Sequence, residues 1–222
     1  MGEYRSVFDI IGPIMVGPSS SHTAGAVRIG KIARRIFGET PEEVEFRLFE
    51  SFAKTHKGHG TDIALTGGML NMEPDDIRLA NAFMIAKEEG LQVSFETAED
   101  KAEHPNTVQM TMRKAKRKLK VIGASIGGGA IEITEIDGFK VKLNSAMPTY
   151  LVRHNDMPGA ILKVAKVFAD CAVNVATMYV TRREKGGLAL MIVEVDSAIR
   201  QEEIMAEIKK VDLVSEVSFF TV

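Results

Sequence analysis

The chain has 222 residues, which is long enough for one large domain or two small ones. Its residues are 45% hydrophobic and 26% charged, as in ordinary soluble globular proteins. The formal net charge of −2 gives no general attraction to nucleic acid or to an anionic membrane, and no apolar run approaches the roughly 20 residues of a membrane span.

The chain contains one cysteine, Cys171. A single thiol forms no internal disulfide, and the N-terminal residues MGEYRSVFDI lack the apolar core of a signal peptide, so we expect a cytoplasmic protein. An iron–sulfur site or a Cys-rich zinc site needs about three or four thiolates, so this chain alone is expected to hold neither. The apolar neighbours of Cys171 predict a buried side chain.

The first part of the chain predicts an α+β domain with mostly antiparallel strands. A helix is expected after the polar residues 19–23, with apolar residues at helical spacing up to Ile36 and a stop at Gly38. Two further helices are expected, an apolar one after a polar loop at residues 54–62 and one from the EPDD motif to Gly90. The predicted strands follow the alternation of apolar and polar residues at 44–48, 91–97, 107–113, 120–126, 130–136 and 139–143.

A domain boundary is expected at residues 144–148, which would leave domains at 1–146 and 147–222. The second domain reads as strand 149–153, helix 158–171, strands 173–181 and 188–195, helix 199–210 and strand 214–220. We expect Ile161, Leu162 and Phe168 to face inward from the first of these helices. The order βαββαβ is that of a ferredoxin-like split unit.

The stretch GPSSSHTAGAVRIG places five polar residues at the start of the first helix. A helix N-terminus carries free N–H groups and a partial positive charge, so Ser19, Ser20, Ser21 and Thr23 would add hydroxyl groups to an anion-binding site. The same dipole disfavours a charged His22, and a neutral imidazole beside a carboxylate site is a candidate base. A polar cap next to a surface histidine explains the composition equally well.

Two more histidines lie in the Gly-flanked motif HKGHG, which we interpret as a loop. The spacing of His56 and His59 permits metal binding, but no third ligand stands nearby. We therefore interpret His56 as a surface residue and leave the role of His59 open, with Thr61 close behind it. Glycines 127–129 lie between two strands, where they permit either close approach of a ligand or a bulge.

The motif HNDMPG lies where the first strand of the second domain meets its helix. Pro158 suits the first helical position, and Asp156 can cap the helix. A structural cap does not explain His154, so a structural and a binding role both stay open.

Three motifs, GPSSSHTAGAVRIG, KGHGTDIAL and GASIGGGAIEI, resemble in sequence and order the beta chain of the iron–sulfur-dependent bacterial L-serine dehydratases. That beta domain is similar to the allosteric substrate-binding domain of certain phosphoglycerate dehydrogenases. Residues 147–222 resemble an ACT domain, a module that senses small molecules.

The resemblance implies a cytoplasmic lyase subunit of amino-acid metabolism and gluconeogenesis, which converts L-serine to pyruvate and ammonia. A [4Fe–4S] cluster would be held by a separate alpha subunit, and this chain would be inactive without it. His22 would be the base or a proton relay. The residues expected to bind substrate are Ser19, Ser20, Ser21 and Thr23, with His59 and Thr61 as secondary members.

In the ACT domain, the resemblance implies an effector site at His154, Asp156, Pro158 and Gly159. Serine-sensing ACT domains have an amide where Asp156 stands, and a carboxylate offers no amide donor. This departure argues against serine and leaves another small amino acid or a cation. Since ACT units pair side by side, a homodimer through residues 147–222 is expected.

Two alternatives remain. The chain could be a sensing module without a catalytic role, because the related phosphoglycerate dehydrogenase domain senses rather than reacts. A metal enzyme that uses His22, His56 and His59 is the weaker alternative, since the flexible glycine-flanked motif gives no sign of a rigid site.

Overall fold

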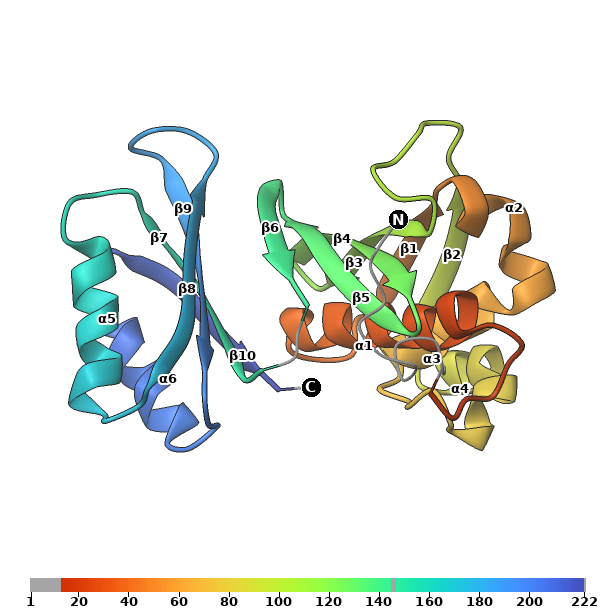
Figure 1. Ribbon diagram of the computed structural model, residues 1–222, viewed down its shortest axis with the longest axis horizontal. Coiled ribbons are helices and arrows are strands. Elements are labelled where there is room, and N and C mark those ends of the chain that lie inside the picture. The colour runs from red at the N-terminus through yellow and green to blue at the C-terminus, as the bar shows by residue number, and fades with distance from the viewer. Residues whose placement is uncertain (1–12, 145–146, 222) are drawn as a thin grey trace. The chain divides into compact units, whose positions relative to one another are not determined.

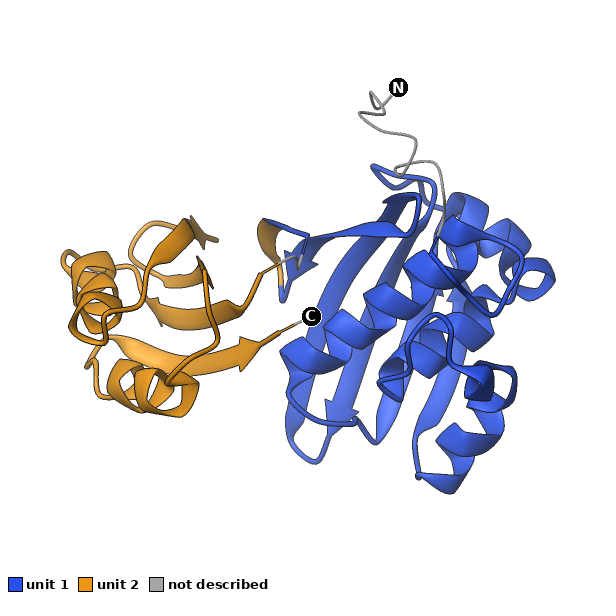
Figure 2. Cartoon of the chain, turned by 60° about the horizontal axis from the view of Figure 1, so that its bottom comes forward, with its two compact units in different colours: residues 1–137, 142–144 blue, residues 138–141, 145–222 orange. Residues whose placement is uncertain are grey.

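The computed structural model describes residues 13–144 and 147–221. The chain divides into two compact units, one of residues 1–137 with 142–144 and one of residues 138–141 with 145–222 (Figure 2). The sequence predicts a domain boundary after residue 146. Residues 145–146 lie outside the described part, so this boundary stays a prediction. Among the described residues, no helix is both long and apolar enough to cross a membrane.

The first unit contains strands β1 to β5 of a six-stranded sheet with the order β2-β1-β3-β4-β5-β6 (Figure 1). The strands of this sheet are β1 (Glu43–Leu48), β2 (Gln92–Thr97), β3 (Thr107–Lys114), β4 (Arg117–Gly127), β5 (Ala130–Ile136) and β6 (Phe139–Leu143). Only the β1–β2 pair of this sheet is parallel among the described pairings, because helices connect these two strands, whereas β3 to β5 follow one another as antiparallel neighbours. The α+β class and the mostly antiparallel pairing predicted from the sequence are confirmed.

The helices of this unit lie over the sheet (Figures 1 and 2). They are the π-helical turn η2 (Ser20–Ala24), α1 (Gly25–Phe37), α2 (Glu50–His59), α3 (Thr61–Met69), the 3-10 turn η3 (Ile77–Asn81) and α4 (Ala82–Glu88). Helix α1 contacts β4 and β5, and α3 packs on α1. As predicted, α1 ends at Gly38, whose φ of 88° is the left-handed conformation that glycine adopts without strain.

Two sequence predictions for these helices are wrong. The HKGHG motif is not a loop, because His56 and His59 lie in the last turns of α2 and only Gly60, with φ of 65°, ends that helix. The segment after EPDD does not form one helix but η3 followed by the short α4, with Asp76 accepting a hydrogen bond from the N–H of Arg78.

The crossing of α1 and α3 depends on two glycines. A Cβ atom on Gly68 would stand 2.7 Å from the backbone nitrogen of Lys31 and 2.9 Å from Cα of Gly30. A Cβ atom on Gly30 would stand 2.6 Å from the carbonyl oxygen of Leu65. The two helix backbones therefore lie closer than any side chain between them would permit.

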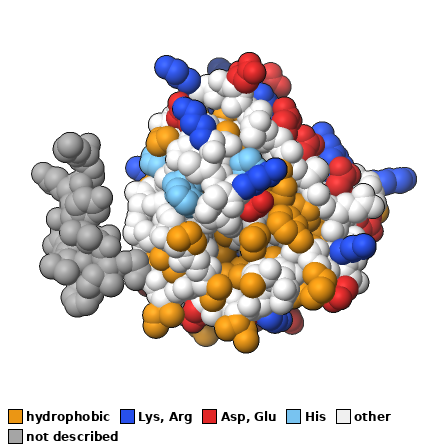
Figure 3. Space-filling model, turned by 90° about the vertical axis from the view of Figure 1, so that its right-hand side faces the viewer, with side chains coloured by type: hydrophobic (Ala, Val, Ile, Leu, Met, Phe, Trp, Pro, Cys, Tyr) orange, Lys and Arg blue, Asp and Glu red, His pale blue; other side chains and the backbone are white. Residues whose placement is uncertain are grey.

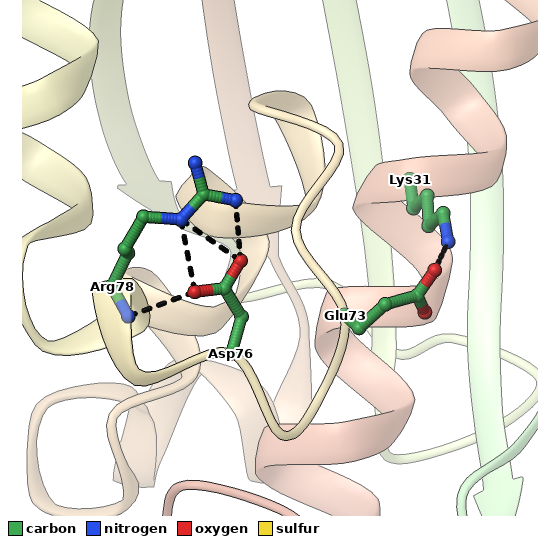
Figure 4. Close-up of polar contacts among 4 residues, drawn as sticks. All are labelled: Lys31, Glu73, Asp76 and Arg78. Atoms are coloured by element: carbon green, nitrogen blue, oxygen red, sulfur yellow. Dashed lines mark hydrogen bonds and ion pairs between the residues drawn. The ribbon is translucent and has the colours of Figure 1, made fainter.

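Ion pairs hold the segment that follows α3. The buried Lys31 of α1 pairs with Glu73, and Arg78 makes a bidentate contact to Asp76 (Figure 4). The N–H of Val16 donates to the carbonyl of Pro74 at 2.7 Å, so the same segment also holds the chain that leads into η2.

The second unit has the ferredoxin-like order βαββαβ that the sequence predicts. Its elements are β7 (Thr149–Asn155), α5 (Ala160–Asp170), β8 (Val175–Arg182), β9 (Leu188–Val195), α6 (Gln201–Lys209) and β10 (Val214–Phe220). The strands form an antiparallel sheet of order β10-β7-β9-β8. Tyr150, Phe168 and Cys171 belong to the core between sheet and helices, which confirms the burial predicted for the cysteine.

Helix α5 differs from its prediction at both its start and its inward face. It begins at Ala160 after Gly159, so Pro158 is not its first residue. Ala160, Val164 and Phe168 are buried, whereas Ile161 is 50% and Leu162 72% exposed. The buried residues recur every four positions, so Leu162, two positions from both Ala160 and Val164, faces away from them, and Ile161 lies at the border of the buried stripe.

We predict that Gly68→Ala destabilises the α1–α3 pair by about 1–3 kcal/mol, because the added methyl group meets backbone atoms that cannot rotate away. The measurement is native-state hydrogen exchange of the α1 and α3 amides, which should become faster.

Gly58→Ala is the matched control, because Gly58 lies inside α2 with nothing within 4 Å of the added Cβ. It should stabilise α2 by about 0.5–1 kcal/mol. Wild-type exchange rates in the Gly68 variant would contradict the packing argument.

Candidate active site

The turn η2 presents His22 at the start of the first helical segment. Ser19 is the N-cap, and its Oγ accepts a hydrogen bond from the backbone N–H of His22 at 3.2 Å. The same Oγ lies 3.3 Å from Nδ1 of the His22 ring. Ser19 therefore caps the start of the turn and also contacts one edge of the imidazole.

Helix α2 supplies the other contacts of the His22 ring. Nε2 of His22 lies 3.1 Å from Oγ of Ser51. The rings of Phe52 and His59 meet the His22 ring edge to face, with centroid distances of 5.3 and 4.8 Å. The side chain of His22 is thus held by one serine at each nitrogen and by two aromatic rings.

The surroundings of His22 favour its neutral form. Burial lowers the pKa of His22 from its ordinary value of 6.5, and the neighbouring His59 lowers it further because two positive charges repel. A neutral imidazole near pH 7 can accept a proton, as the sequence analysis expects of this residue. The cause that dominates is burial, rather than the helix dipole on which that expectation was based.

The corner between α2 and α3 places His59 and Thr61 beside η2. Thr23 donates from Oγ1 to the backbone carbonyl of His59 at 3.3 Å. Nδ1 of His59 and Oγ1 of Thr61 are buried, and neither has a hydrogen-bond partner in the part of the chain that is described. Buried polar atoms are normally paired, so these two unsatisfied atoms are an exception at this corner.

The motif GASIGGGAIEI, which runs from β4 into β5, reaches η2 and the start of α1 from the sheet. Ser125 of β4 is fully buried against the start of α1, where a Cβ on Gly25 would stand 2.8 Å from Cβ of Ser125. Residues 127–129 all have positive φ and form the turn between β4 and β5. The carbonyl of Gly129 accepts from Nη1 of Arg28 at 2.6 Å, which ties this turn to α1.

An apolar pocket of about 190 Å³ opens next to the two histidines. Its lining comes from the chain before η2, from the α2–α3 corner and from η3: Val16, Gly17, Pro18, Thr23, His59, Gly60, Ile63, Ala64, Leu79 and Ala80. Histidine side chains lie next to hydrophobic ones on the face shown in Figure 3. The pocket is therefore almost entirely apolar, with Thr23 and His59 as its polar side chains, and the His22 ring lies behind His59.

Of the predicted site residues, Thr23 and His59 line this pocket. Four of the predicted residues form a chain of contacts. Ser19 contacts the His22 ring, the His22 ring contacts the His59 ring, and Thr23 donates to the His59 carbonyl. Ser20 and Ser21 are half-buried within η2. His56 points to the carbonyl of Ala53 on its own helix, as expected of a residue outside the site.

Sequence analysis missed Ser51 and Phe52. Interpreting residues 54–62 as a loop hid the fact that Ser51 and His59 are two helical turns apart and lie on one face of α2. A helical interpretation of residues 50–59 would have predicted that face, although not its contact with His22.

In the second unit, the HNDMPG turn differs from its prediction. Asp156 does not cap α5, because its carboxylate accepts from Nη1 of Arg182 at 2.7 Å and from the N–H of Gly186 at 3.0 Å. These contacts hold the pKa of Asp156 below its ordinary value, the Gly186 bond more than Arg182. The residue at the start of the helix is Gly159, with φ of 88°.

His154 is 1% exposed, and its Nδ1 lies 2.8 Å from the carbonyl oxygen of Asn155. Its Nε2 is buried without a hydrogen-bond partner among the described residues. Of the four predicted effector residues, His154 therefore lies in β7 and the other three lie in the turn between β7 and α5, where the Asp156 carboxylate is already engaged.

Neither unit offers a metal site within residues 13–144 and 147–221, where no group of three or more His, Cys, Asp or Glu side chains is arranged to hold a metal ion. Cys171 is buried in the core of the second unit. The residues of this chain therefore do not fit a [4Fe–4S] cluster, which needs about four thiolates.

Comparison with known proteins places both units. Residues 6–89 match the family of the serine dehydratase beta chain, and residues 151–216 match the AHAS small subunit-like ACT domain. The chain is 47% identical to the probable L-serine dehydratase beta chain of Bacillus subtilis, over 97% of this chain and 98% of that protein. It is 38% identical to the L-serine dehydratase beta chain of Peptoniphilus asaccharolyticus, over 88% of this chain and 89% of that protein.

A third relative is named as a different enzyme. The chain is 30% identical to a D-3-phosphoglycerate dehydrogenase of Methanocaldococcus jannaschii, over 87% of this chain but only 36% of that protein. The two beta chains, by contrast, match it along nearly their whole length. This chain belongs to the L-serine dehydratase beta chain family and contains an ACT domain.

Proposed function

We propose that this chain is the beta subunit of an L-serine dehydratase and forms pyruvate and ammonia from L-serine together with an alpha subunit. The 47% identity to a beta chain along almost its full length carries this proposal. A [4Fe–4S] cluster would belong to the alpha subunit, since Cys171 is the one thiol here and is buried in the ACT core. A cytoplasmic location and a supply of pyruvate for gluconeogenesis are part of the same proposal.

The reaction removes the α-proton and the hydroxyl group of serine, and the resulting enamine gives pyruvate and ammonia on reaction with water. We assign His22 the role of base or proton relay, because its lowered pKa keeps the ring neutral and ready to accept a proton. The hydroxyl groups of Ser19, Ser20, Ser21 and Thr23 would hold the substrate carboxylate. The unpaired buried atoms of His59 and Thr61 support secondary roles.

The composition of the pocket lining supports the proposal that an alpha subunit completes the site. Serine carries an ammonium group, yet none of the pocket-lining residues in the described part of the chain is acidic. A buried ammonium group needs a carboxylate or several hydrogen-bond acceptors. The alpha subunit would complete the site on that side.

A second function is a sensing module without a catalytic role. The match to a phosphoglycerate dehydrogenase over 87% of this chain favours it, because the same two-unit arrangement occurs within a differently named enzyme. In that case the pocket beside His22 would bind a small acid and regulate a partner.

The proposal predicts that His22→Ala, co-expressed with the alpha subunit, forms pyruvate from L-serine roughly 10²–10⁴-fold more slowly than wild type under anaerobic conditions. His56→Ala is the control, because it removes another histidine of α2, one whose ring nitrogen lies 3.0 Å from the carbonyl oxygen of Ala53 in the same helix. Assembly of both variants with the alpha subunit is checked by gel filtration. Equal turnover of wild type and His22→Ala would favour the sensing module.

The pKa of His22 also predicts how the rate depends on pH. Because His22 must be neutral to accept a proton, the acid limb of kcat/KM should lie below pH 6.5. His59→Gln removes the repulsion that lowers the pKa of His22, so that pKa rises and the acid limb moves to higher pH. His56→Gln should leave the limb in place. An acid limb that does not move in His59→Gln would contradict the coupling of the two rings.

We further propose that the ACT domain binds a small amino acid or a cation at His154, Asp156, Pro158 and Gly159, and that it pairs with a second copy of the chain. Such a ligand has to displace Arg182 from Asp156 if its own positive charge is to reach the carboxylate.

The homodimer predicts that deletion of residues 147–222 converts a dimer to a monomer in sedimentation velocity. The physical reason is that the first unit retains its own sheet and helices, while the proposed contact surface is removed. A truncated chain that sediments as a dimer would place the contact in the first unit instead.

A further inference from the structure

Both ring nitrogens of His22 face serine hydroxyl groups, but the two serines are held differently. Ser19 Oγ already accepts the backbone N–H of His22, so it is part of the helical cap and serves two groups at once. Ser51 Oγ has Nε2 of His22 as its hydrogen-bond partner at 3.1 Å. Ser51 lies far from His22 in the sequence and makes no contribution to the cap.

The backbone around Ser51 fixes where its hydroxyl group points. The N–H of Ser51 donates to the carbonyl of Pro105 at 2.9 Å, and its own carbonyl accepts from Oγ1 of Thr55 at 2.8 Å. The preceding residue, Glu50, has φ of 38°, a left-handed conformation that costs a residue with a side chain about 1–2 kcal/mol. Strain of this kind persists where the surrounding structure requires it, and here it begins α2 in the orientation that brings Ser51 to the ring.

We propose that Ser51 is a positioning residue for His22, which fixes the orientation of the ring and the nitrogen that carries its single proton. This inference rests on the proposed function of His22. A neutral imidazole has one N–H, and its tautomer is set by the partners of its two nitrogens. Ser19 faces Nδ1 and Ser51 faces Nε2, so the Ser51 hydroxyl is the partner that holds Nε2 and completes the pair of contacts that selects one tautomer.

The loss of Ser51 has consequences for the ring and for catalysis. In Ser51→Ala, Nε2 loses its hydrogen bond, while the contacts of the ring with Phe52 and His59 remain. Of the two serines, Ser19 is then left at the ring, with its Oγ 3.3 Å from Nδ1, and its hydroxyl group can either donate to Nδ1 or accept from it. With Nε2 no longer held, the ring samples both tautomers and more than one orientation. A base displaced by about 1 Å can lose on the order of 10²-fold in rate, so we expect kcat to fall tenfold to a hundredfold, with KM changed less than threefold.

The test combines nitrogen NMR of the His22 ring in the full chain with turnover of the chain assembled with its alpha subunit. Wild type should show one dominant neutral tautomer, and Ser51→Ala should show exchange-averaged ring nitrogens and the lower kcat. Ser51→Thr retains a hydroxyl group and should restore both. Thr40→Ala is the control, because it removes a hydroxyl group that accepts from Arg34 and that has no part in orienting Ser51.

A wild-type ring spectrum in Ser51→Ala overturns the proposal, and so does a Ser51→Thr variant that resembles Ser51→Ala. An altered ring spectrum with unchanged kcat also overturns it, provided that His22→Ala is inactive. If His22→Ala proves fully active, the proposed function fails on that result, and the NMR spectra alone decide whether Ser51 positions the ring.

Discussion

The close contact of α1 with α3 is the constraint on which the candidate site depends. Gly30 and Gly68 let the two backbones meet without side chains between them. Because η2 continues directly into α1, and α2 joins α3 through one glycine, the crossing of α1 and α3 also brings η2 against the end of α2. The contact between the His22 and His59 rings is therefore a consequence of helix packing and not of any local sequence signal.

At the candidate site, polar side chains lie beside an apolar pocket. On the polar side, two half-buried imidazoles stand edge to face, and burial together with repulsion lowers the pKa of His22. On the other side, the pocket is closed by apolar residues from η3 and from the chain before η2, a segment held by the Lys31–Glu73 and Asp76–Arg78 pairs. Within the described residues, the pocket lining holds neither an acidic side chain nor a lysine or arginine, so a ligand with two charged groups would need further partners on the proposed alpha subunit.

Local patterns predicted the strands well, because alternating Val, Ile and Met residues have a period that no helix shares. The βαββαβ unit followed from the order of those patterns. The helix at residues 50–59 was missed because Gly58 and Gly60 read as loop residues, although only Gly60 has the left-handed backbone that ends a helix. Ser51 was missed for a different reason, since its role exists only through a tertiary contact with His22.

In the turn between β7 and α5, the carboxylate of Asp156 changes which partners the proposed effector site can bind. An amide at position 156 could donate to a ligand carboxylate, whereas the Asp156 carboxylate attracts donors of its own chain. It takes Arg182 from β8 and the N–H of Gly186 from the loop that follows, and so joins that loop to the β7–α5 turn. Because both contacts favour the charged carboxylate, its pKa lies below the ordinary value and the tie persists at neutral pH. A cationic effector must therefore compete with a guanidinium group that is already in place, and its affinity will report that exchange rather than simple entry into an open site.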